Sequence, residues 1–195
     1  MRAFLAVPVV TPALEPFTAL RERLIAAVDA VRWVPAESPH ITLHFFGAID
    51  DAAARRALAA VTPALAGHAP LRLRLRGLGA FPSQRHPRVL WWGVDGDLVA
   101  LHALAAACQA ALSAAGFVVE ARPWHPHCTL GRPGHPWPGH AVRSWLALGR
   151  EAPATPLFSA DRAVLYESVR GPDGVSHHAR AWLALGGEAA STPVG

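Results

Sequence analysis

The chain of 195 residues contains no lysine, so all 18 of its basic side chains are arginine. A Schiff-base lysine, the covalent lysyl-nucleotide of an ATP-dependent ligase and the lysine of a P-loop are therefore excluded. Guanidinium groups bind phosphate well, but a bias of this kind is most simply a preference of the source genome. The absence of lysine thus removes several enzyme classes without selecting one.

Cysteine is also scarce. Cys108 and Cys128 form neither a CxxC motif nor a disulfide framework, which indicates a reducing compartment, and we expect a cytoplasmic protein. The apolar run after Arg2 could begin a signal peptide, but Pro8 and Pro12 interrupt it, and we interpret it as a strand. No stretch approaches the roughly 20 apolar residues that cross a bilayer, so no membrane partner is expected.

The overall composition is typical of one compact domain with a basic surface. With 52% hydrophobic residues the chain can bury a sizeable core, which we place in a single domain over residues 1–186, followed by a flexible tail over residues 187–195. Only 16% of the residues are charged, yet the formal net charge is +4 and the pI is about 10.4. Such a surface attracts anionic ligands. A monomer is the default expectation.

Hydrophobic periodicity predicts an alternation of strands and helices. Strands are predicted over residues 2–10, 40–47, 71–76, 88–94, 117–121, 127–130, 160–170 and 175–185. Helices are predicted over residues 15–31, 51–65, 98–115 and 141–148. Gly171-Pro172-Asp173-Gly174 has the composition of a hairpin turn between the last two strands. Because the order strand, helix, strand occurs twice, the chain reads as two related halves.

One short motif occurs in each half. Pro39-His40-Ile41-Thr42-Leu43 recurs as Pro126-His127-Cys128-Thr129-Leu130, and the two histidines are 127 − 40 = 87 positions apart. Residues two apart on a strand point to the same face, so each half presents one imidazole beside one hydroxyl. If the halves face each other across a cleft, two histidines and two threonines converge on one point.

This set of side chains suits the hydrolysis of a cyclic phosphodiester. The reaction takes a proton from the attacking water and gives one to the departing ribose oxygen. Imidazoles with an ordinary pKa of about 6.5 can supply both functions near neutral pH. Threonine hydroxyls can donate hydrogen bonds to the non-bridging phosphate oxygens.

The double motif resembles the HxTx motifs of the two-histidine (2H) phosphoesterases, specifically the RNA 2′,3′-cyclic phosphodiesterases once called 2′-5′ RNA ligases. The resemblance extends to Arg2-Ala3-Phe4, Arg88-Val89-Leu90-Trp91 and Leu165-Tyr166-Glu167-Ser168. It implies a bilobal α+β fold, with two pseudo-symmetric lobes that each carry an antiparallel sheet and helices, and an active cleft between them. It also implies a metal-independent enzyme without a cofactor, whose product bears a 2′-phosphate.

The same resemblance assigns roles to individual residues. It implies that His40 is the proton donor and His127 the proton acceptor, and that Thr42 and Thr129 contact the phosphate. Arg132 matches an arginine that often follows the second motif and would also bind phosphate. Strict strand alternation, however, points Arg132 away from the face of His127, so this contact requires a strand end or a bulge.

Other residues near the motifs are interpreted from their positions on the strands. Cys128 is expected to be a core side chain rather than a nucleophile, because it faces away from its neighbours. His125 shares the face of His127 if the strand starts early, and a structural role is the simpler expectation. His44 lies on the face of His40 by alternation, either at the rim or in contact with a ligand. The aromatic residues of the apolar strands, which are Phe46, Trp91 and Trp92, are interpreted as core.

Four questions stay open at the level of sequence. Arg72, Arg74 and Arg76 alternate with leucines, which predicts a solvated face of a strand, or a basic track for RNA if that face borders the cleft. Histidines at 40, 44, 125 and 127 could instead belong to a metal-dependent hydrolase, although carboxylates are sparse nearby. The domain could also bind RNA without catalysis. The substrate could be an RNA end or a small cyclic nucleotide with a 2′,3′-cyclic phosphate.

Overall fold

The computed structural model describes residues 1–84, 86–134, 136–171, 174–187 and 192–193. The fold is α+β, as predicted. The strands are β1 Arg2–Pro8, β2 Val31–Trp33, β3 His40–Ala48, β4 Leu71–Phe81, β5 Val89–Gly96, β6 His127–Pro133, β7 Phe158–Ala160, β8 Arg162–Gly171, β9 Gly174–Ala184 and β10 Thr192–Pro193. The helices are α1 Leu14–Ala27, α2 Asp51–Ala66, α3 Leu98–Ala114 and α4 Gly139–Glu151.

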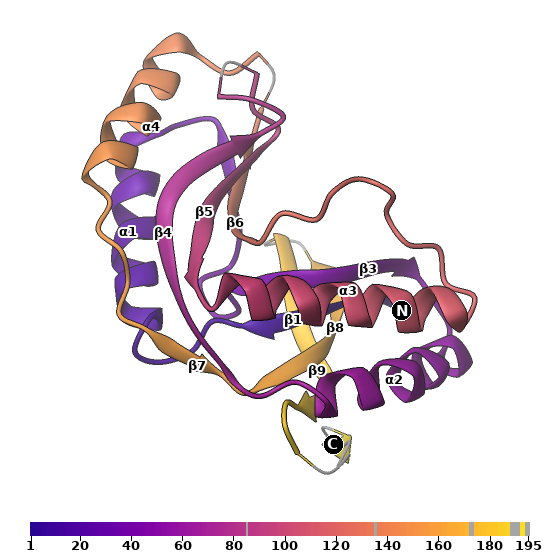
Figure 1. The fold of residues 1–195 in the computed structure, drawn as a ribbon. Helices are drawn as coiled ribbons and strands as arrows, with labels where there is room; N and C mark the ends of the chain where they lie inside the picture. The colour runs from indigo at the N-terminus through magenta and orange to yellow at the C-terminus, as the bar shows by residue number, and fades with distance from the viewer. Residues whose placement is uncertain (85, 135, 172–173, 188–191, 194–195) are drawn as a thin grey trace.

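The strands form one curved antiparallel sheet in the order β10-β9-β8-β1-β3-β6-β5-β4-β7, with β2 paired to β6 (Figure 1). The two predicted lobes are the two halves of this sheet. They meet between β3 and β6, which pair at a single position, Ile41 with Cys128. Because β3 and β6 carry the two motifs, this junction places both of them at the centre of the sheet.

The helices pack as two pairs against the sheet (Figure 1). Helices α2 and α3 pack against each other, with α3 on β3 and α2 on β8 and β9, whereas α1 packs against α4, which lies on β4. Helix α1 follows β1 of one lobe but packs on the other lobe, where Phe17 stacks on Trp92 of β5 at 6.3 Å between ring centroids. Helix α3 follows β5 and in turn packs on β3 of the first lobe. Apolar residues from both lobes and all four helices form one core cluster. The other face of the sheet is left for the motifs.

Local sequence explains the elements that frame the site. In β4, Leu71, Leu73 and Leu75 are buried while Arg72 and Arg76 are exposed, which confirms the predicted wet face. Helix α2 begins as predicted, because the Asp50 carboxylate accepts a hydrogen bond of 2.7 Å from the backbone N–H of Ala53.

Two predictions of secondary structure are wrong. Residues 117–121 do not form a strand. Phe117 and Val119 of this segment pack against the core, while Val118 is 91% exposed. The alternation of buried and exposed side chains therefore comes from an extended segment that lies along the core without hydrogen bonding to a described strand. Helix α1 ends at Ala27 and not at Val31, because Val31 begins β2 and pairs with Pro133 of β6.

The C-terminal region agrees with the predicted hairpin. Strands β8 and β9 pair up to Gly171 opposite Gly174, although Pro172 and Asp173 of the predicted turn lie outside the described residues. Of the predicted flexible tail, Thr192–Pro193 pairs with β9, and residues 188–191 and 194–195 lie outside the described part of the chain. Within the described ranges, no helix combines the length and hydrophobicity needed to span a bilayer.

Gly79 gives a test of this architecture. It lies opposite Trp91, and a Cβ at this position would overlap the indole ring, so Gly79→Ala should lower the free energy of unfolding by about 1–3 kcal/mol. Gly67→Ala is the control, because its Cβ would meet only ordinary contacts at 3.5 and 3.6 Å; it should change stability by less than about 0.5 kcal/mol. Urea denaturation of both variants measures the difference, and equal losses would contradict the contact.

Candidate active site

The two motifs face each other across the β3–β6 junction. In an antiparallel pair, residues directly opposite each other point to the same face, so the register of Ile41 with Cys128 fixes the neighbours on either side. Each histidine then lies opposite the threonine of the other motif; the pairs are His40 with Thr129 and Thr42 with His127. The two histidines are diagonal neighbours at about 7–8 Å between backbone positions. The two rings are close enough for His127 to lower the pKa of His40.

Burial follows the same pattern in both motifs. Ile41, Leu43, Cys128 and Leu130 are fully buried, whereas both histidines and both threonines are half-buried. The predicted alternation is confirmed. Burial raises the pKa of the Cys128 thiol to about 12, so that it stays protonated at neutral pH, as expected of a core side chain.

The two catalytic candidates are oriented by equivalent hydrogen bonds. His40 Nδ1 lies 2.7 Å from the carbonyl oxygen of Ser38, and His127 Nδ1 lies 2.8 Å from that of His125. A carbonyl oxygen only accepts, so each Nδ1 carries the proton and donates it. The Nε2 atom of each ring is thereby left for proton transfer.

His40 lies in an aromatic box on the open face of its lobe. Its ring stacks on Phe4 at 4.6 Å between centroids, with Tyr166 at 5.8 Å and the edge of His177 at 5.3 Å. Burial is the largest cause that lowers the pKa of His40, to about 4, and nearby His177 and His127 add to it; the Ser38 carbonyl opposes the shift. The ring is therefore neutral at pH 7 in the free protein.

The surroundings of His127 have the same character. Phe81 packs edge-on against its ring at 5.1 Å, and Trp91 lies at 6.3 Å. Burial is again the largest cause that lowers the pKa of His127; the hydrogen bond to the His125 carbonyl opposes the shift, and nearby Arg132 adds to it. Trp91 corrects a prediction, because it lies opposite Thr129 and so faces the site, whereas Trp92 belongs to the core as expected.

A bulge in β6 brings Arg132 to the site. Trp91 lies opposite Thr129, but the next residue of β5, Leu90, lies opposite Gly131, so β6 carries one extra residue at Leu130. The extra residue reverses the alternation, and Arg132 lines the same cavity as His127. The structure thus contains the irregularity that a phosphate contact by Arg132 requires.

A second bulge removes His44 from the site. Ala6 lies opposite Thr42, but Leu5 lies opposite His44, so the alternation of β3 reverses after the motif. His44 is 7% exposed and packs against Phe46 at 4.6 Å between ring centroids. The expectation that His44 shares the face of His40 is therefore wrong.

A cavity of about 1000 Å³ opens beside His127. One wall is the end of the β4–β5 hairpin, including Phe81 and Arg88, and the other is the segment that leads into β6, including Arg122 and Trp124. The ring of His125 also lines it, so this residue borders the site in addition to holding His127 through its carbonyl. His40 does not line the cavity and lies in its aromatic box.

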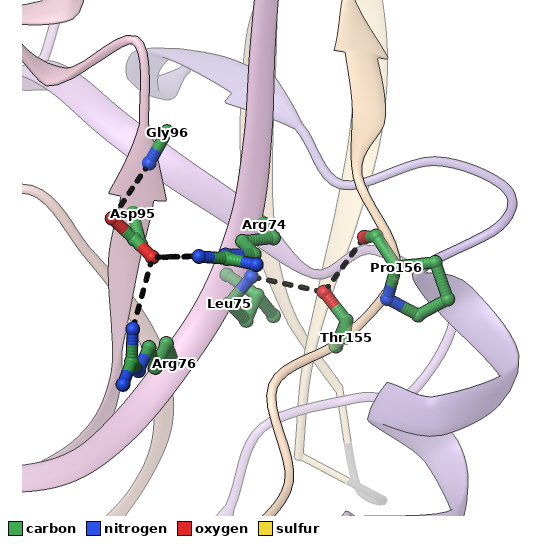
Figure 2. A network of polar contacts seen from close by, with 7 residues as sticks. All are labelled: Arg74, Leu75, Arg76, Asp95, Gly96, Thr155 and Pro156. Atoms are coloured by element: carbon green, nitrogen blue, oxygen red, sulfur yellow. Dashed lines mark hydrogen bonds and ion pairs between the residues drawn. The ribbon is translucent and has the colours of Figure 1, made fainter.

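The arginine row of β4 is tied to an acid. Figure 2 shows Asp95 between Arg74 and Arg76, at 2.7 Å and 3.6 Å from their guanidinium nitrogens. The hydrogen bond from Arg74 is the largest cause that lowers the pKa of the Asp95 carboxyl, so the acid stays charged and neutralises part of the row. By alternation along β5, Asp95 shares the face of Trp91, so the arginine row lies on the same face of the sheet as the motifs.

His177 is the residue that sequence reasoning missed. It is brought to His40 by the β8–β9 hairpin, and its Nδ1 lies 3.1 Å from the Oγ of Ser168 on the neighbouring strand. No motif surrounds it, and its distance in sequence from His40 hides the contact.

As for a metal, no cluster of three or more His, Cys, Asp or Glu side chains suited to hold an ion occurs among the residues that the structure describes.

Comparison with known proteins gives matches along most of the chain. The family model described as 2′-5′ RNA ligase superfamily matches residues 7–172. An RNA 2′,3′-cyclic phosphodiesterase of Geobacillus stearothermophilus is 32% identical over 165 residues, which cover 85% of this chain but 51% of that protein. One of Methanothermobacter thermautotrophicus is 33% identical over 132 residues, covering 68% of this chain and 71% of its own length. The chain thus spans about half of the first relative and more of the second.

Solved structures with the same fold include two bacterial proteins. TT0787 of Thermus thermophilus superposes with a TM-score of 0.76 at 24% identity and covers 96% of this chain and 100% of its own. E. coli LigT, in complex with 3′-AMP, superposes with a TM-score of 0.74 at 21% identity and covers 94% and 97%. At these identities the likeness concerns the fold.

The environment of His40 predicts a pH dependence of stability. Its pKa is about 4 in the folded chain and about 6.5 when unfolded. Protonation of His40 therefore favours the unfolded state. Its contribution to the free energy of unfolding is intact above pH 6.5 and is lost as the pH falls through 4. The loss amounts to about 3 kcal/mol. Between pH 7 and pH 4, His40→Gln should lose less stability than the original chain in urea denaturation, and NMR titration should give the pKa directly. Equal losses in both proteins would contradict this assignment.

Proposed function

Since the chain belongs to the 2′-5′ RNA ligase superfamily, we propose that it hydrolyses RNA-type 2′,3′-cyclic phosphate ends to 2′-phosphomonoesters. The observation that carries this proposal is the β3–β6 junction, where two imidazoles and two hydroxyls lie on one face of the sheet. The names of the relatives from Geobacillus stearothermophilus and Methanothermobacter thermautotrophicus support the same reaction.

The proposed mechanism uses the two Nε2 atoms on opposite sides of phosphorus. His127 Nε2 accepts a proton from water while the water oxygen forms a bond to phosphorus. The bond from phosphorus to the ribose 3′ oxygen breaks, and His40 Nε2–H donates a proton to that oxygen. The 2′ ester bond is retained. Each step of general acid or base catalysis contributes about 10²- to 10⁴-fold.

Thr42, Thr129 and Arg132 are the proposed phosphate ligands. The two hydroxyls flank the histidines on the same face and can donate hydrogen bonds to the non-bridging oxygens. Arg132 lines the cavity beside His127, from which a guanidinium can bind two phosphate oxygens at once. Together they hold the phosphorus between the acid and the base.

The lowered pKa values of the histidines fit this role when the substrate charge is included. His40 must be protonated to act as the acid, although its pKa is about 4 in the free protein. A phosphate anion beside an imidazole stabilises the imidazolium and raises its pKa, so binding of the substrate charges the acid. His127 starts neutral, which is the form that the base requires.

Substitution of either histidine should remove activity. We expect His40→Ala and His127→Ala each to lower kcat on a 2′,3′-cyclic nucleotide by about 10²-fold or more, and the double variant to lose less than the product of the two. Circular dichroism checks that the fold is retained. Near-normal turnover of either single variant refutes the role of that residue.

The same assay distinguishes the metal-dependent alternative. Turnover should be unchanged after exhaustive treatment with a chelator; abolition by the chelator and recovery with zinc would instead establish a metal-dependent hydrolase.

The pH dependence of kcat/KM should be bell-shaped with an acidic maximum. Activity is lost at low pH as His127 becomes protonated and at high pH as His40 loses its proton. Because the pKa of each ring is lowered in the free protein, both limbs should shift to the acidic side, with the maximum below about pH 6.5. The profile of kcat, which reports the bound state, should lie at higher pH. A flat kcat/KM profile between about pH 5 and 8 would count against a histidine pair.

A further inference from the structure

The cavity beside His127 is larger than a cyclic phosphate requires. Its volume is about 1000 Å³, and it continues past Arg132 to the end of the β4–β5 hairpin. Pockets that bind small ligands commonly span about 300–1,000 Å³, so this one can hold a whole nucleotide and more. The substrate therefore has room on the side away from the reacting bond.

The cavity contains more positively than negatively charged side chains. Its lining includes three arginines and one acid, and Arg122 is held by Glu120 at 2.8 Å. Within the described part of the chain, neither Arg88 nor Arg132 forms an ion pair. This distinguishes them from Arg74 and Arg76 of β4, which share Asp95.

Arg88 and Arg132 lie at adjacent positions in the sheet. Because Leu90 lies opposite Gly131, continuing the pairing places Val89 beside Arg132, and Arg88 is the next residue of the chain. The two arginines therefore lead away from Thr129 toward the hairpin, and both line the cavity. In an RNA chain, the phosphodiester on the 5′ side of the last nucleotide lies one ribose away from its 2′,3′-cyclic phosphate. A second cation beyond Arg132 is placed to meet it.

We propose that Arg88 binds the 5′-phosphodiester of the terminal nucleotide, so that the enzyme selects the cyclic-phosphate end of an RNA chain over a free cyclic mononucleotide. This inference rests on the proposed function of the site and names its substrate class. Phe81 and Trp124, on the two walls of the cavity, offer apolar surfaces to the base of that nucleotide. Arg132 serves the reacting phosphate and Arg88 the next one.

The test compares two substrates that differ by one nucleotide. Adenosine 2′,3′-cyclic phosphate lacks the second phosphate, and the dinucleotide ApA ending in a 2′,3′-cyclic phosphate contains it. We expect kcat/KM to be at least about tenfold higher for the dinucleotide, and this preference to fall with salt as phosphate contacts do. A third substrate, adenosine 2′,3′-cyclic phosphate with a 5′-phosphate, tells whether a terminal phosphate suffices or a chain is needed.

Arg88→Ala and Arg88→Gln test the residue itself. The Arg88 side chain is exposed, and its backbone N–H bond to the Phe81 carbonyl does not depend on the side chain, so both variants should fold. Each should lower kcat/KM for the dinucleotide about tenfold and change that for the mononucleotide less than about twofold. Arg150→Ala, which removes the same charge from an exposed position on α4, should change neither.

A binding experiment separates this inference from the proposed reaction. Calorimetry measures the affinities of two proteins, His127→Ala and the double variant His127→Ala with Arg88→Ala. The two ligands are adenosine 2′-phosphate and ApA that ends in a 2′-phosphate. A preference for the dinucleotide that disappears with Arg88 supports the second phosphate site, even if no cyclic substrate is hydrolysed and the proposed function fails. Equal affinities for the two ligands, or a preference that survives Arg88→Ala, overturn it.

Discussion

The candidate active site depends on one antiparallel residue pair, Ile41 with Cys128, which joins the two halves of the sheet. Both side chains are completely buried, so the pair is fixed by the core and cannot slip without turning apolar groups outward. A slip of either strand by one residue would turn the histidine of that strand to the wrong face. The chemistry on one face is thus positioned by hydrophobic packing on the other.

Desolvation of the imidazoles is the second constraint. Aromatic rings from β1, β4 and β5 pack against the half-buried histidines, so each imidazole is partly desolvated and charge on it is disfavoured. The same desolvation strengthens the interaction of an imidazolium with a phosphate anion. The aromatic packing disfavours protonated His40 in the free protein, and a bound anion favours it, so protonation of this ring is linked to anion binding.

Periodicity predicted most of the elements, and the repeat that is visible in the chain predicted the two facing motifs. The fold class was implied by the resemblance of those motifs to the 2H phosphoesterases. Prediction from the sequence failed where the backbone departs from regular alternation. One extra residue at Leu130 returns Arg132 to the site, and the reversal after Thr42 removes His44 from it. No residue type marks either bulge. His177 was missed for another reason, since a hairpin distant in sequence brings it to His40.

The exchange of helices between lobes has a mechanical consequence. Helix α1 follows a strand of one lobe and packs on the other, α3 does the reverse, and one core runs through both. Moving the lobes apart would expose the apolar side chains of that shared core to water. A hinge opening between the lobes is therefore opposed by the free energy of hydrating those side chains. A ligand then enters and leaves without separation of the lobes, and adaptation to different ligands falls to the end of the β4–β5 hairpin and the segment before β6, which border the cavity.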